Sequence, residues 1–295
     1  MNTTAHSEVG RITSLFIKNA RSAFKNDEFI SRQWQELNYL DKPDFAHAEE
    51  EYRAFEHVLK TEGIELNYFS ESDLVKMDSI YCRDAAIATD GGMIICRMGK
   101  AGRANEPEQE RMAFEKKGIK ILGEIVAPGT LEGGDVAWLD QKTMGVGHTY
   151  RTNELGIEQL RALLSGIGVE LIVAEMPHYK GKNDVFHLMS VLSPVDENLA
   201  VVYSALMPIK FRNQLLDRGF ELLEVPDEEF ESMGCNVLAI APRKCVMVKG
   251  NPITKQRLEE ADCQVFEYEG QEISVKGGGG PTCLTRPIMR IKCAY

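Results

Sequence analysis

The sequence lacks the features that define several protein classes. It has 34 lysine and arginine residues against 45 aspartate and glutamate residues, a formal net charge of −11, so it has no basic surplus with which to bind nucleic acid. No apolar run approaches the roughly 18–20 residues that cross a bilayer. The first residues show no charged-then-apolar signal pattern. These absences predict a cytoplasmic protein with neither a nucleic-acid nor a membrane partner.

The seven cysteines form no Cys-x-x-Cys pair and no zinc-ribbon spacing. Their odd number and wide gaps argue against a disulfide framework. We therefore expect cysteines such as Cys82, Cys96 and Cys245 to be small buried hydrophobic residues that stay reduced. The 43% of hydrophobic and 27% of charged residues are typical of a globular protein.

An internal repeat organises the chain. Five helix-type patterns are followed by a glycine or a short polar stop, and then by a β-type run. The helical patterns cover residues 47–61, 107–117, 153–165, 208–218 and 252–261. The β-type runs cover residues 64–69, 119–125, 169–176, 220–226 and 263–269.

A hairpin precedes each of the last four helices. The hairpins cover residues 84–99, 134–148, 185–203 and 236–250, and each turns on a polar stretch. The first copy is less regular, with a strand at 10–19 and a polar insert at 20–46. We predict a single α/β domain over residues 1–295, in which ββαβ units form a five-bladed, pseudo-symmetric α/β-propeller.

Four polar residues share one position of the repeat. Aligning the hairpin starts matches Asp84, Asp135, His187 and Asn236, with spacings of 51, 52 and 49 residues. If the first strand of each blade lines a central channel, these side chains converge there. Acid and base groups inside apolar strands are rarely buried without a partner or a task. Any one of them could cap a strand, but together they predict a shared site.

Two further features indicate chemistry. Cys283 follows a run of glycines at 277–280, which allows a close approach of the backbone and makes this cysteine a candidate nucleophile. His187, in an apolar segment that we predict to be a strand, is a candidate general acid and base.

Carboxylates surround these candidates in the sequence. The motif at 132–135 places Glu132 and Asp135 on either side of two glycines. The pair could bind a metal, serve as acid and base, or hold a cation; we expect no metal, because no second oxygen-ligand cluster accompanies it. With Asp78 and Asp84, the carboxylates predict an anionic pocket for a planar cation such as a guanidinium.

Six segments resemble the guanidino-group-modifying superfamily, which includes arginine deiminases, dimethylarginine dimethylaminohydrolases and amidinotransferases. They read DSIYCRDAAIATD (78–90), RMGKAGR (97–103), LEGGDVAWL (131–139), YRTN (150–153), FHLMSVLSPV (186–195) and GGGGPTCLTRP (277–287). The resemblance implies the five-bladed pentein fold, in agreement with the repeat.

The resemblance implies that Cys283 is the nucleophile, that His187 is the general acid and base, and that Glu132 orients His187 or contacts the substrate. Whether Glu132 or Asp135 partners His187 stays open. The implied reaction needs no cofactor: a C–N bond breaks, a covalent thiouronium forms, and water releases a ureido product such as citrulline. An amidinotransferase and a non-catalytic binding protein are the alternatives.

The resemblance also implies residues that bind the guanidino substrate. Asp84 matches the carboxylate that binds the guanidinium, Asp78 matches a further substrate contact, and Arg103 and Arg151 match residues that bind the α-carboxylate. We count Asp135 as a further substrate-binding residue.

The residue before Asp84 is Arg83, where dimethylarginine hydrolases typically have an acidic residue. We therefore expect unmethylated or monosubstituted guanidines to be better substrates than asymmetric dimethylarginine. The sequence leaves open whether the chain forms a homo-oligomer.

Overall fold

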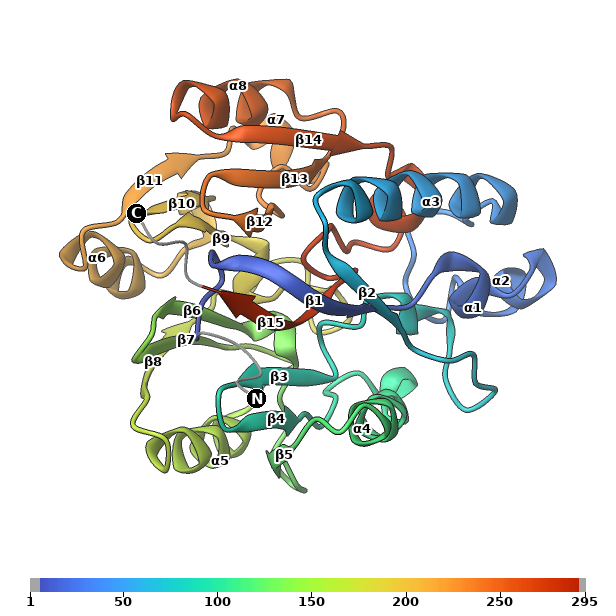
Figure 1. Ribbon diagram of the computed structural model, residues 1–295, viewed down its shortest axis with the longest axis horizontal. Coiled ribbons are helices and arrows are strands. Elements are labelled where there is room, and N and C mark those ends of the chain that lie inside the picture. Colours follow the sequence, from blue (N-terminus) through green and yellow to red (C-terminus); the bar gives the residue numbers. More distant parts are fainter. Residues whose placement is uncertain (1–5, 292–295) are drawn as a thin grey trace.

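The computed structural model of the chain describes residues 6–291. Within this range, fifteen strands form five three-stranded sheets that are arranged around the middle of the molecule (Figure 1). Four of the sheets are continuous in sequence. They contain β3 (Ala86–Thr89), β4 (Gly92–Ile95) and β5 (Ile121–Glu124); β6 (Val136–Asp140), β7 (Thr143–His148) and β8 (Glu170–Glu175); β9 (Leu192–Asp196), β10 (Leu199–Val202) and β11 (Glu221–Glu224); and β12 (Leu238–Ala241), β13 (Lys244–Val248) and β14 (Gln264–Tyr268).

Each of these sheets has the same topology. The first strand is antiparallel to the second, and the third strand is parallel to the second. A helix connects the second strand to the third and lies on the outside of the molecule (Figure 1). These helices are α4 (Glu106–Lys116), α5 (Glu154–Ser165), α6 (Ile209–Asp217) and α8 (Pro252–Glu260). A short helix, α7 (Asp227–Phe230), follows β11. The ββαβ order predicted from the sequence is confirmed.

The fifth sheet is assembled from both ends of the described chain. It contains β15 (Arg286–Ile291), β1 (Arg11–Ile17) and β2 (Glu65–Tyr68), with α3 (Phe45–Thr61) connecting β1 to β2. Strand β15 is antiparallel to β1 and supplies the first strand that the first repeat lacked. The insert at 20–46 contains α1 (Ala20–Phe24) and α2 (Asp27–Gln33). Five sheets of one topology agree with five repeated units.

Local sequence explains where the helices begin and end. The side chain of Asp44 caps α3 by accepting a hydrogen bond from the His47 amide, and Asn153 caps α5 in the same way. Each connecting helix is followed by a residue of positive φ, which ends the helix and turns the chain into the third strand. These residues are Gly63, Gly118, Gly168, Gly219 and Asp262.

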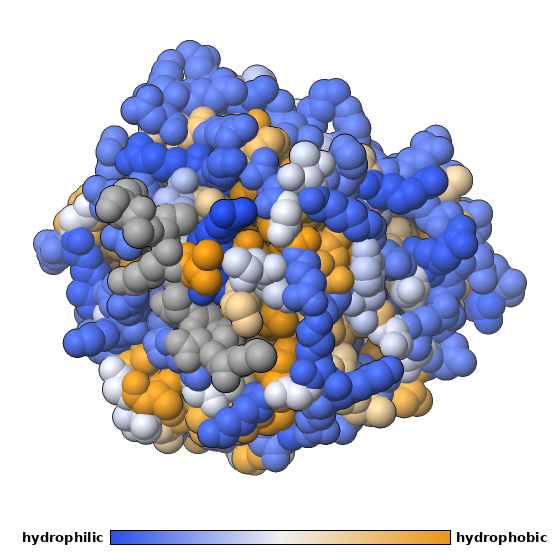
Figure 2. Space-filling view, in the orientation of Figure 1, coloured by the Kyte–Doolittle hydropathy of each residue, from blue (hydrophilic) through white to orange (hydrophobic). Residues whose placement is uncertain are grey.

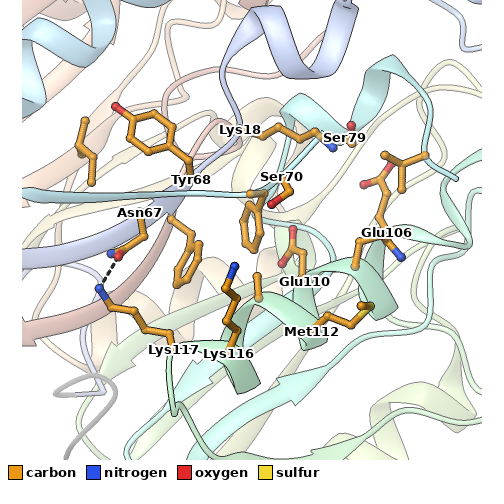
Figure 3. A pocket seen from close by; sticks show the side chains of 16 residues that line it. Lys18, Asn67, Tyr68, Ser70, Ser79, Glu106, Glu110, Met112, Lys116 and Lys117 are labelled. Atoms are coloured by element: carbon orange, nitrogen blue, oxygen red, sulfur yellow. Dashed lines mark hydrogen bonds between the residues drawn. The ribbon is translucent and has the colours of Figure 1, made fainter. Parts of the chain in front are cut away.

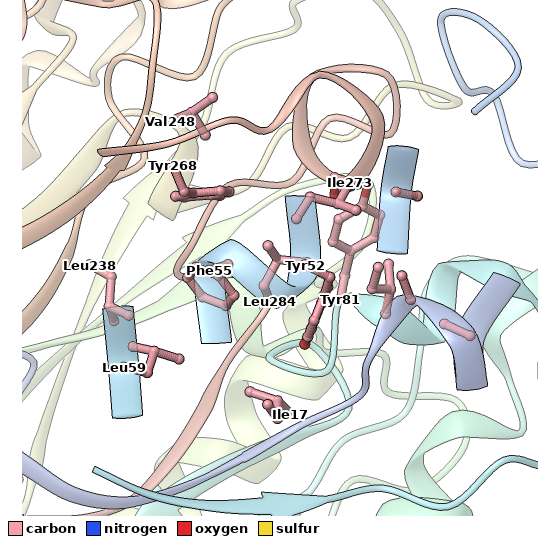
Figure 4. Packing of buried hydrophobic residues seen from close by; sticks show 14 of the residues in the cluster. Ile17, Tyr52, Phe55, Leu59, Tyr81, Leu238, Val248, Tyr268, Ile273 and Leu284 are labelled. Carbon is pink, nitrogen blue, oxygen red and sulfur yellow. Dashed lines mark hydrogen bonds between the residues drawn. The ribbon is translucent and has the colours of Figure 1, made fainter. Parts of the chain in front are cut away.

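Buried hydrophobic side chains fill the spaces between helices and sheets. On α3, Tyr52 and Phe55 pack in one cluster with residues of β12, β13 and β14 (Figure 4), and the ring centroids of Phe55 and Tyr268 lie 4.8 Å apart. Leu284 is fully buried in the same cluster. Because Leu284 follows Cys283, this packing fixes the chain at the candidate nucleophile.

The outer surface is mainly hydrophilic, with hydrophobic residues gathered towards the middle of the face in Figure 2. None of the helices over residues 6–291 is long and apolar enough to cross a membrane. Five cysteines are buried and unpaired, as expected, namely Cys82, Cys96, Cys235, Cys245 and Cys263. Cys293 lies outside the described residues.

Candidate active site

Five polar side chains occupy one place in the five repeats. Asp84, Asp135, His187 and Asn236 lie just ahead of β3, β6, β9 and β12, as the alignment of the hairpins predicts. Cys283 lies ahead of β15 and is the fifth member of this set. The alignment of the four hairpins does not include Cys283, because residues 284–291 show no hairpin pattern that would mark them as the first strand of a repeat.

The prediction that these groups lie inside apolar strands is wrong. His187 precedes the one-turn helix η4 (Leu188–Ser190), and β9 begins only at Leu192. Asp135 likewise ends the one-turn helix η3 (Gly133–Asp135). The physical reason is that such turns offer backbone N–H groups to a buried carboxylate, whereas N–H groups inside a strand bond to the neighbouring strands.

His187 and Glu132 form a buried pair. Nε2 of His187 lies 2.9 Å from Oε2 of Glu132, so Glu132 is the carboxylate of the 132–135 motif that contacts the imidazole. Burial opposes the charge on His187, but the carboxylates of Asp135 and Asp84 and the bond to Glu132 raise the pKa of His187 to about 9. Burial acts to raise the pKa of Glu132, but the hydrogen bond to His187 and the charges of His187, Arg151 and Arg103 together lower it. The imidazole is therefore protonated at neutral pH.

Asp84 faces the same imidazole from the other side. Its Oδ1 lies 3.9 Å from Nδ1 of His187 and accepts a hydrogen bond of 2.9 Å from the Gly134 amide. A Cβ atom on Gly134 would stand 2.4 Å from Nδ1 of His187 and 2.7 Å from Oδ1 of Asp84. Only glycine at position 134 allows His187 and Asp84 to come this close.

Arg103 is fully engaged by its neighbours. It donates hydrogen bonds to Oδ2 of Asp84 (2.5 Å), to both carboxylate oxygens of Glu106, and to the carbonyl oxygen of Tyr81 (2.8 Å). The expectation that Arg103 binds a substrate α-carboxylate stays a prediction, because these bonds leave its guanidinium few free donors. The contacts favour a role in holding Asp84 in place.

Lys100, which the sequence reading did not single out, connects two of the predicted carboxylates. Its Nζ contacts Oδ2 of Asp78 (2.5 Å), and its backbone amide donates to Oε1 of Glu132 (2.9 Å). Arg151 places Nη1 3.6 Å from the same Glu132 oxygen and has a weak contact of 3.5 Å to the Asp184 carbonyl. Arg151 is thus less engaged than Arg103. No sequence pattern marks Lys100, since a lysine in a glycine-rich turn is usually exposed.

Asp135 is buried away from the cavities that surround Cys283. It accepts hydrogen bonds from the hydroxyls of Thr149 (2.7 Å) and Thr152 (2.6 Å) and from the Leu188 amide (3.1 Å). Burial raises the pKa of Asp135 to about 6. Its bond to the residue after His187 favours a positioning role over the substrate contact expected from the sequence.

The Cys283 side chain is half-buried. Nδ2 of Asn236 lies 3.4 Å from its Sγ, and burial and the charge of Asp84 raise the pKa of the thiol while the bond from Asn236 lowers it. The glycine run packs against an aromatic ring, since a Cβ atom on Gly279 would lie 2.5 Å from ring atoms of Tyr81. The glycines therefore let the chain pass Tyr81 and reach the site.

A small inner cavity of about 20 Å³ lies among Asp78, Asp84, His187 and Cys283. An outer cavity of about 110 Å³ also borders His187 and Cys283 and extends to the exposed Leu40. Arg103 lines the inner cavity, and Lys100 and Arg151 line both.

Asp84, Glu132 and His187 each place a potential metal-ligand atom within 4.8 Å of the others. Asp84 and Glu132 already accept hydrogen bonds from Arg103 and the Lys100 amide. Each of the two carboxylates thus accepts a hydrogen bond from a cation or from a backbone N–H group. Such carboxylates can also bind a cation that donates hydrogen bonds, such as a guanidinium.

Arg83 does not stand beside the substrate site, as the expected preference for unmethylated guanidines assumed; the preference itself stays a prediction. Its side chain is fully buried and turns away from the inner cavity, donating hydrogen bonds to Oε1 of Glu8 (2.8 Å) and to the Val136 carbonyl (3.1 Å). Arg83 and Asp84 are neighbours in sequence, but only Asp84 lines the cavity. Arg83 therefore gives no reason to expect poor binding of a methylated guanidinium.

Known proteins resemble the chain over nearly its whole length. It is 26% identical to an N(G),N(G)-dimethylarginine dimethylaminohydrolase of Pseudomonas aeruginosa over 84% of this chain and 91% of that protein, and 23% identical to an arginine deiminase of Listeria welshimeri over 94% and 75%. A structure of the Pseudomonas aeruginosa enzyme in complex with citrulline aligns with a TM-score of 0.75, at 24% identity, over 95% of this chain and all of that one. The product-bound N-terminal domain of ArgZ, an arginine dihydrolase of cyanobacteria, aligns with a TM-score of 0.79, at 16% identity, over 95% and 98%.

The fold thus places the protein among the mixed α/β proteins of the pentein type, which are built from repeated three-stranded units. Residues 14–290 match the family model for N,N-dimethylarginine dimethylhydrolase, eukaryotic, and the chain belongs to this family. It is accordingly a hydrolase that acts on guanidino groups.

Proposed function

We propose that the protein hydrolyses a C–N bond in the guanidino group of arginine or a substituted arginine, with Cys283 as nucleophile. The products are a ureido compound such as citrulline and ammonia or an alkylamine. One observation carries the proposal: Asp84, His187 and Cys283, from three different repeats, border one cavity, with Glu132 bonded to His187. A nucleophile, a proton donor and a cation-binding carboxylate are the groups that this reaction needs.

Substrate binding prepares the nucleophile. The guanidinium lies in the inner cavity, where Asp84 accepts its N–H groups and Asp78 offers a second carboxylate. This holds the guanidinium carbon against the Cys283 sulfur. The bound cation favours the thiolate and so offsets the burial that raises the pKa of Cys283.

The chemical steps use one proton carrier. The Cys283 sulfur bonds to the guanidinium carbon, and the tetrahedral adduct breaks a C–N bond while His187 gives its proton to the departing amine. A covalent thiouronium remains. His187 then takes a proton from water, the water oxygen bonds to the carbon, the C–S bond breaks to return the thiolate, and the ureido oxygen releases its remaining proton to the solvent. Glu132 stabilises the charged imidazole throughout.

The remaining residues act around this centre. Arg151, which lines both cavities and has only long contacts of its own, binds the α-carboxylate of the substrate. Arg103 positions Asp84, and Asp135 positions His187 through the Leu188 amide. These roles predict that agmatine, which lacks the carboxylate, is a poor substrate.

An N-methylated arginine is the preferred substrate in this proposal. The family match supports it, and the orientation of Arg83 removes the reason to expect a preference for unmethylated guanidines. Arginine itself is the alternative substrate for the same mechanism.

A panel of asymmetric dimethylarginine, arginine and agmatine tests the proposal, with ureido product and released amine measured separately. Cys283→Ser should lower turnover at least about a thousandfold, whereas the control Cys263→Ser, a free thiol in another sheet, should not. Mass spectrometry should detect a covalent adduct on Cys283. A Cys283→Ser variant that keeps a tenth of the wild-type rate would exclude Cys283, and guanidino transfer to an added amine in place of ureido product would indicate an amidinotransferase.

The same proposal takes residues 1–295 as one catalytic domain, whose five sheets form a closed propeller around the cavities. A single cooperative unfolding transition that is shifted as a whole by bound product supports one domain. Two separable transitions would contradict it.

A further inference from the structure

A wide hollow on the molecule lies away from Cys283. It has a volume of about 620 Å³ and lies between β2 and α4 (Figure 3). Its walls combine apolar side chains, such as Phe16, Phe69, Leu66 and Val75, with polar and charged ones. None of its lining residues borders the inner cavity at Cys283. We call it the β2–α4 groove.

Three polar groups in the β2–α4 groove lack partners among residues 6–291. The Lys18 side chain is only 3% exposed; its ammonium makes no hydrogen bond or ion pair there, although the charges of Glu106 and Glu110 act on it. The buried Ser79 hydroxyl and Oε2 of Glu110 also have no hydrogen-bond partner. Figure 3 draws Lys18 and Ser79 among the residues that line the groove. Buried polar groups without partners are costly, and a ligand is one way to satisfy them.

The charges around the groove favour an anion. Glu106 also lines it, but both of its carboxylate oxygens are bonded to Arg103. Burial and then the charge of Glu106 raise the pKa of Glu110 well above its usual range, which favours the neutral carboxyl group as a hydrogen-bond donor. Lys18 and Lys116 are the lining ammonium groups that make no ion pair within the described chain. The Lys116 amine points into the groove in Figure 3.

We propose that the β2–α4 groove is a second ligand site, which binds a small organic carboxylate with an apolar body. The carboxylate accepts hydrogen bonds from Lys18, Ser79 and Glu110, and the apolar body lies against Phe16 and Phe69. The groove has the volume of typical small-molecule sites, and its lining offers both apolar contacts and polar groups. Binding an anion also favours the charged form of Lys18, whose pKa burial lowers.

Calorimetric titration of the whole protein with octanoate and with octanamide tests the charge requirement without any mutation. We expect octanoate to bind at least about tenfold more tightly than octanamide, which has the same apolar body and no charge. Equal affinities, or no octanoate binding with a dissociation constant below about 1 mM, would overturn the proposal.

The variant Lys18→Met locates the site. It replaces the ammonium with an apolar side chain of similar length and should weaken octanoate binding at least about tenfold. The control Lys249→Met, which removes an exposed ammonium paired with Glu269, should leave the affinity unchanged. In the absence of ligand, Lys18→Met should unfold at the same or a higher temperature, because it removes an unpaired buried charge. Unchanged octanoate affinity, or a lower unfolding temperature that marks Lys18 as structural, would contradict the proposal.

Discussion

Arg83 and Asp84 are consecutive residues whose side chains serve two different regions of the molecule. Asp84 belongs to the candidate active site, where acidic groups alternate with Lys100, Arg103, Arg151 and His187. Arg83 belongs to a cluster with Arg286 and Arg290, in which three nearly buried guanidinium groups share one carboxylate, Glu8. We call this second region the arginine cluster.

The two regions compensate their buried charges differently. In the active site, opposite charges pair directly. In the arginine cluster, the guanidinium groups bond to backbone carbonyls of neighbouring sheets: Arg83 reaches Val136 of β6, Arg286 reaches Ala86 of β3, and Arg290 reaches Ala239 of β12. Several of their N–H groups have no partner among residues 6–291. We infer that the active site is arranged for chemistry and that the arginine cluster holds the sheets together.

The largest effect is expected in the active site. His187→Gln removes the proton carrier and should lower kcat by about 10²–10⁴-fold. Steady-state kinetics would measure this, with the unfolding temperature as a control for the fold. A loss of less than tenfold would show that His187 does not carry the proton.

In the arginine cluster, Glu8→Gln should act on stability alone. It leaves three buried guanidinium groups without a carboxylate and should lower the free energy of unfolding by about 3–5 kcal/mol, measured by urea unfolding. The kcat/KM of the folded protein should stay unchanged. The exposed Glu115→Gln on α4 is the control and should change stability by less than about 0.5 kcal/mol. A fall in kcat/KM without a fall in stability would show that Glu8 acts in catalysis and would contradict the assignment of the arginine cluster to stability.

The pH dependence of stability should trace to the active site. The pKa of His187 is raised in the folded protein to about 9, above the value of about 6.5 in the unfolded chain. Its contribution is therefore fully present below pH 6.5 and is lost as the pH rises through about 9, to a total on the order of 3 kcal/mol. Urea unfolding between pH 6 and about 9.5 would measure the slope, which His187→Gln should reduce. An equal slope in the variant would contradict this assignment.

The smallest effect is expected at Asp135, which makes no direct hydrogen bond to His187 but acts on it through its charge and through the Leu188 amide. Asp135→Asn loses an acceptor for the Leu188 amide or for the two threonine hydroxyls, and should lower kcat by about 10–100-fold by displacing His187. KM should change little if Asp135 does not contact the substrate. Asp140→Asn, an exposed residue at the far end of β6, is the matched control. A rise in KM at constant kcat would instead support the substrate contact expected from the sequence.

The sequence predicted the elements whose signals are local. Helices and third strands agree with their periodic patterns, and the alignment of Asp84, Asp135, His187 and Asn236 survives because each precedes a hairpin. Strand β15 was missed because its partner β1 lies at the opposite end of the described chain, and no local pattern records such a pairing.

The sequence also could not predict the directions in which side chains point. The sequence placed Arg83 beside the substrate and Arg103 at its carboxylate, yet one turns to Glu8 and the other is bonded to Asp84. Both residues lie in irregular turns, where no period of two or 3.6 fixes which way a side chain points. The pairing of Lys100 with Asp78 was hidden for the same reason.

The pairing of β15 with β1 bears on how the protein is made. Arg11 pairs with Ile291, so at 5–20 residues per second the ribosome delivers β15 roughly 15–60 s after β1. During that time the edge of β1 is unpaired and open to association with other chains. Cys283 emerges just ahead of β15, so a nascent chain stays inactive until the strand that completes the sheet of β1 is also made.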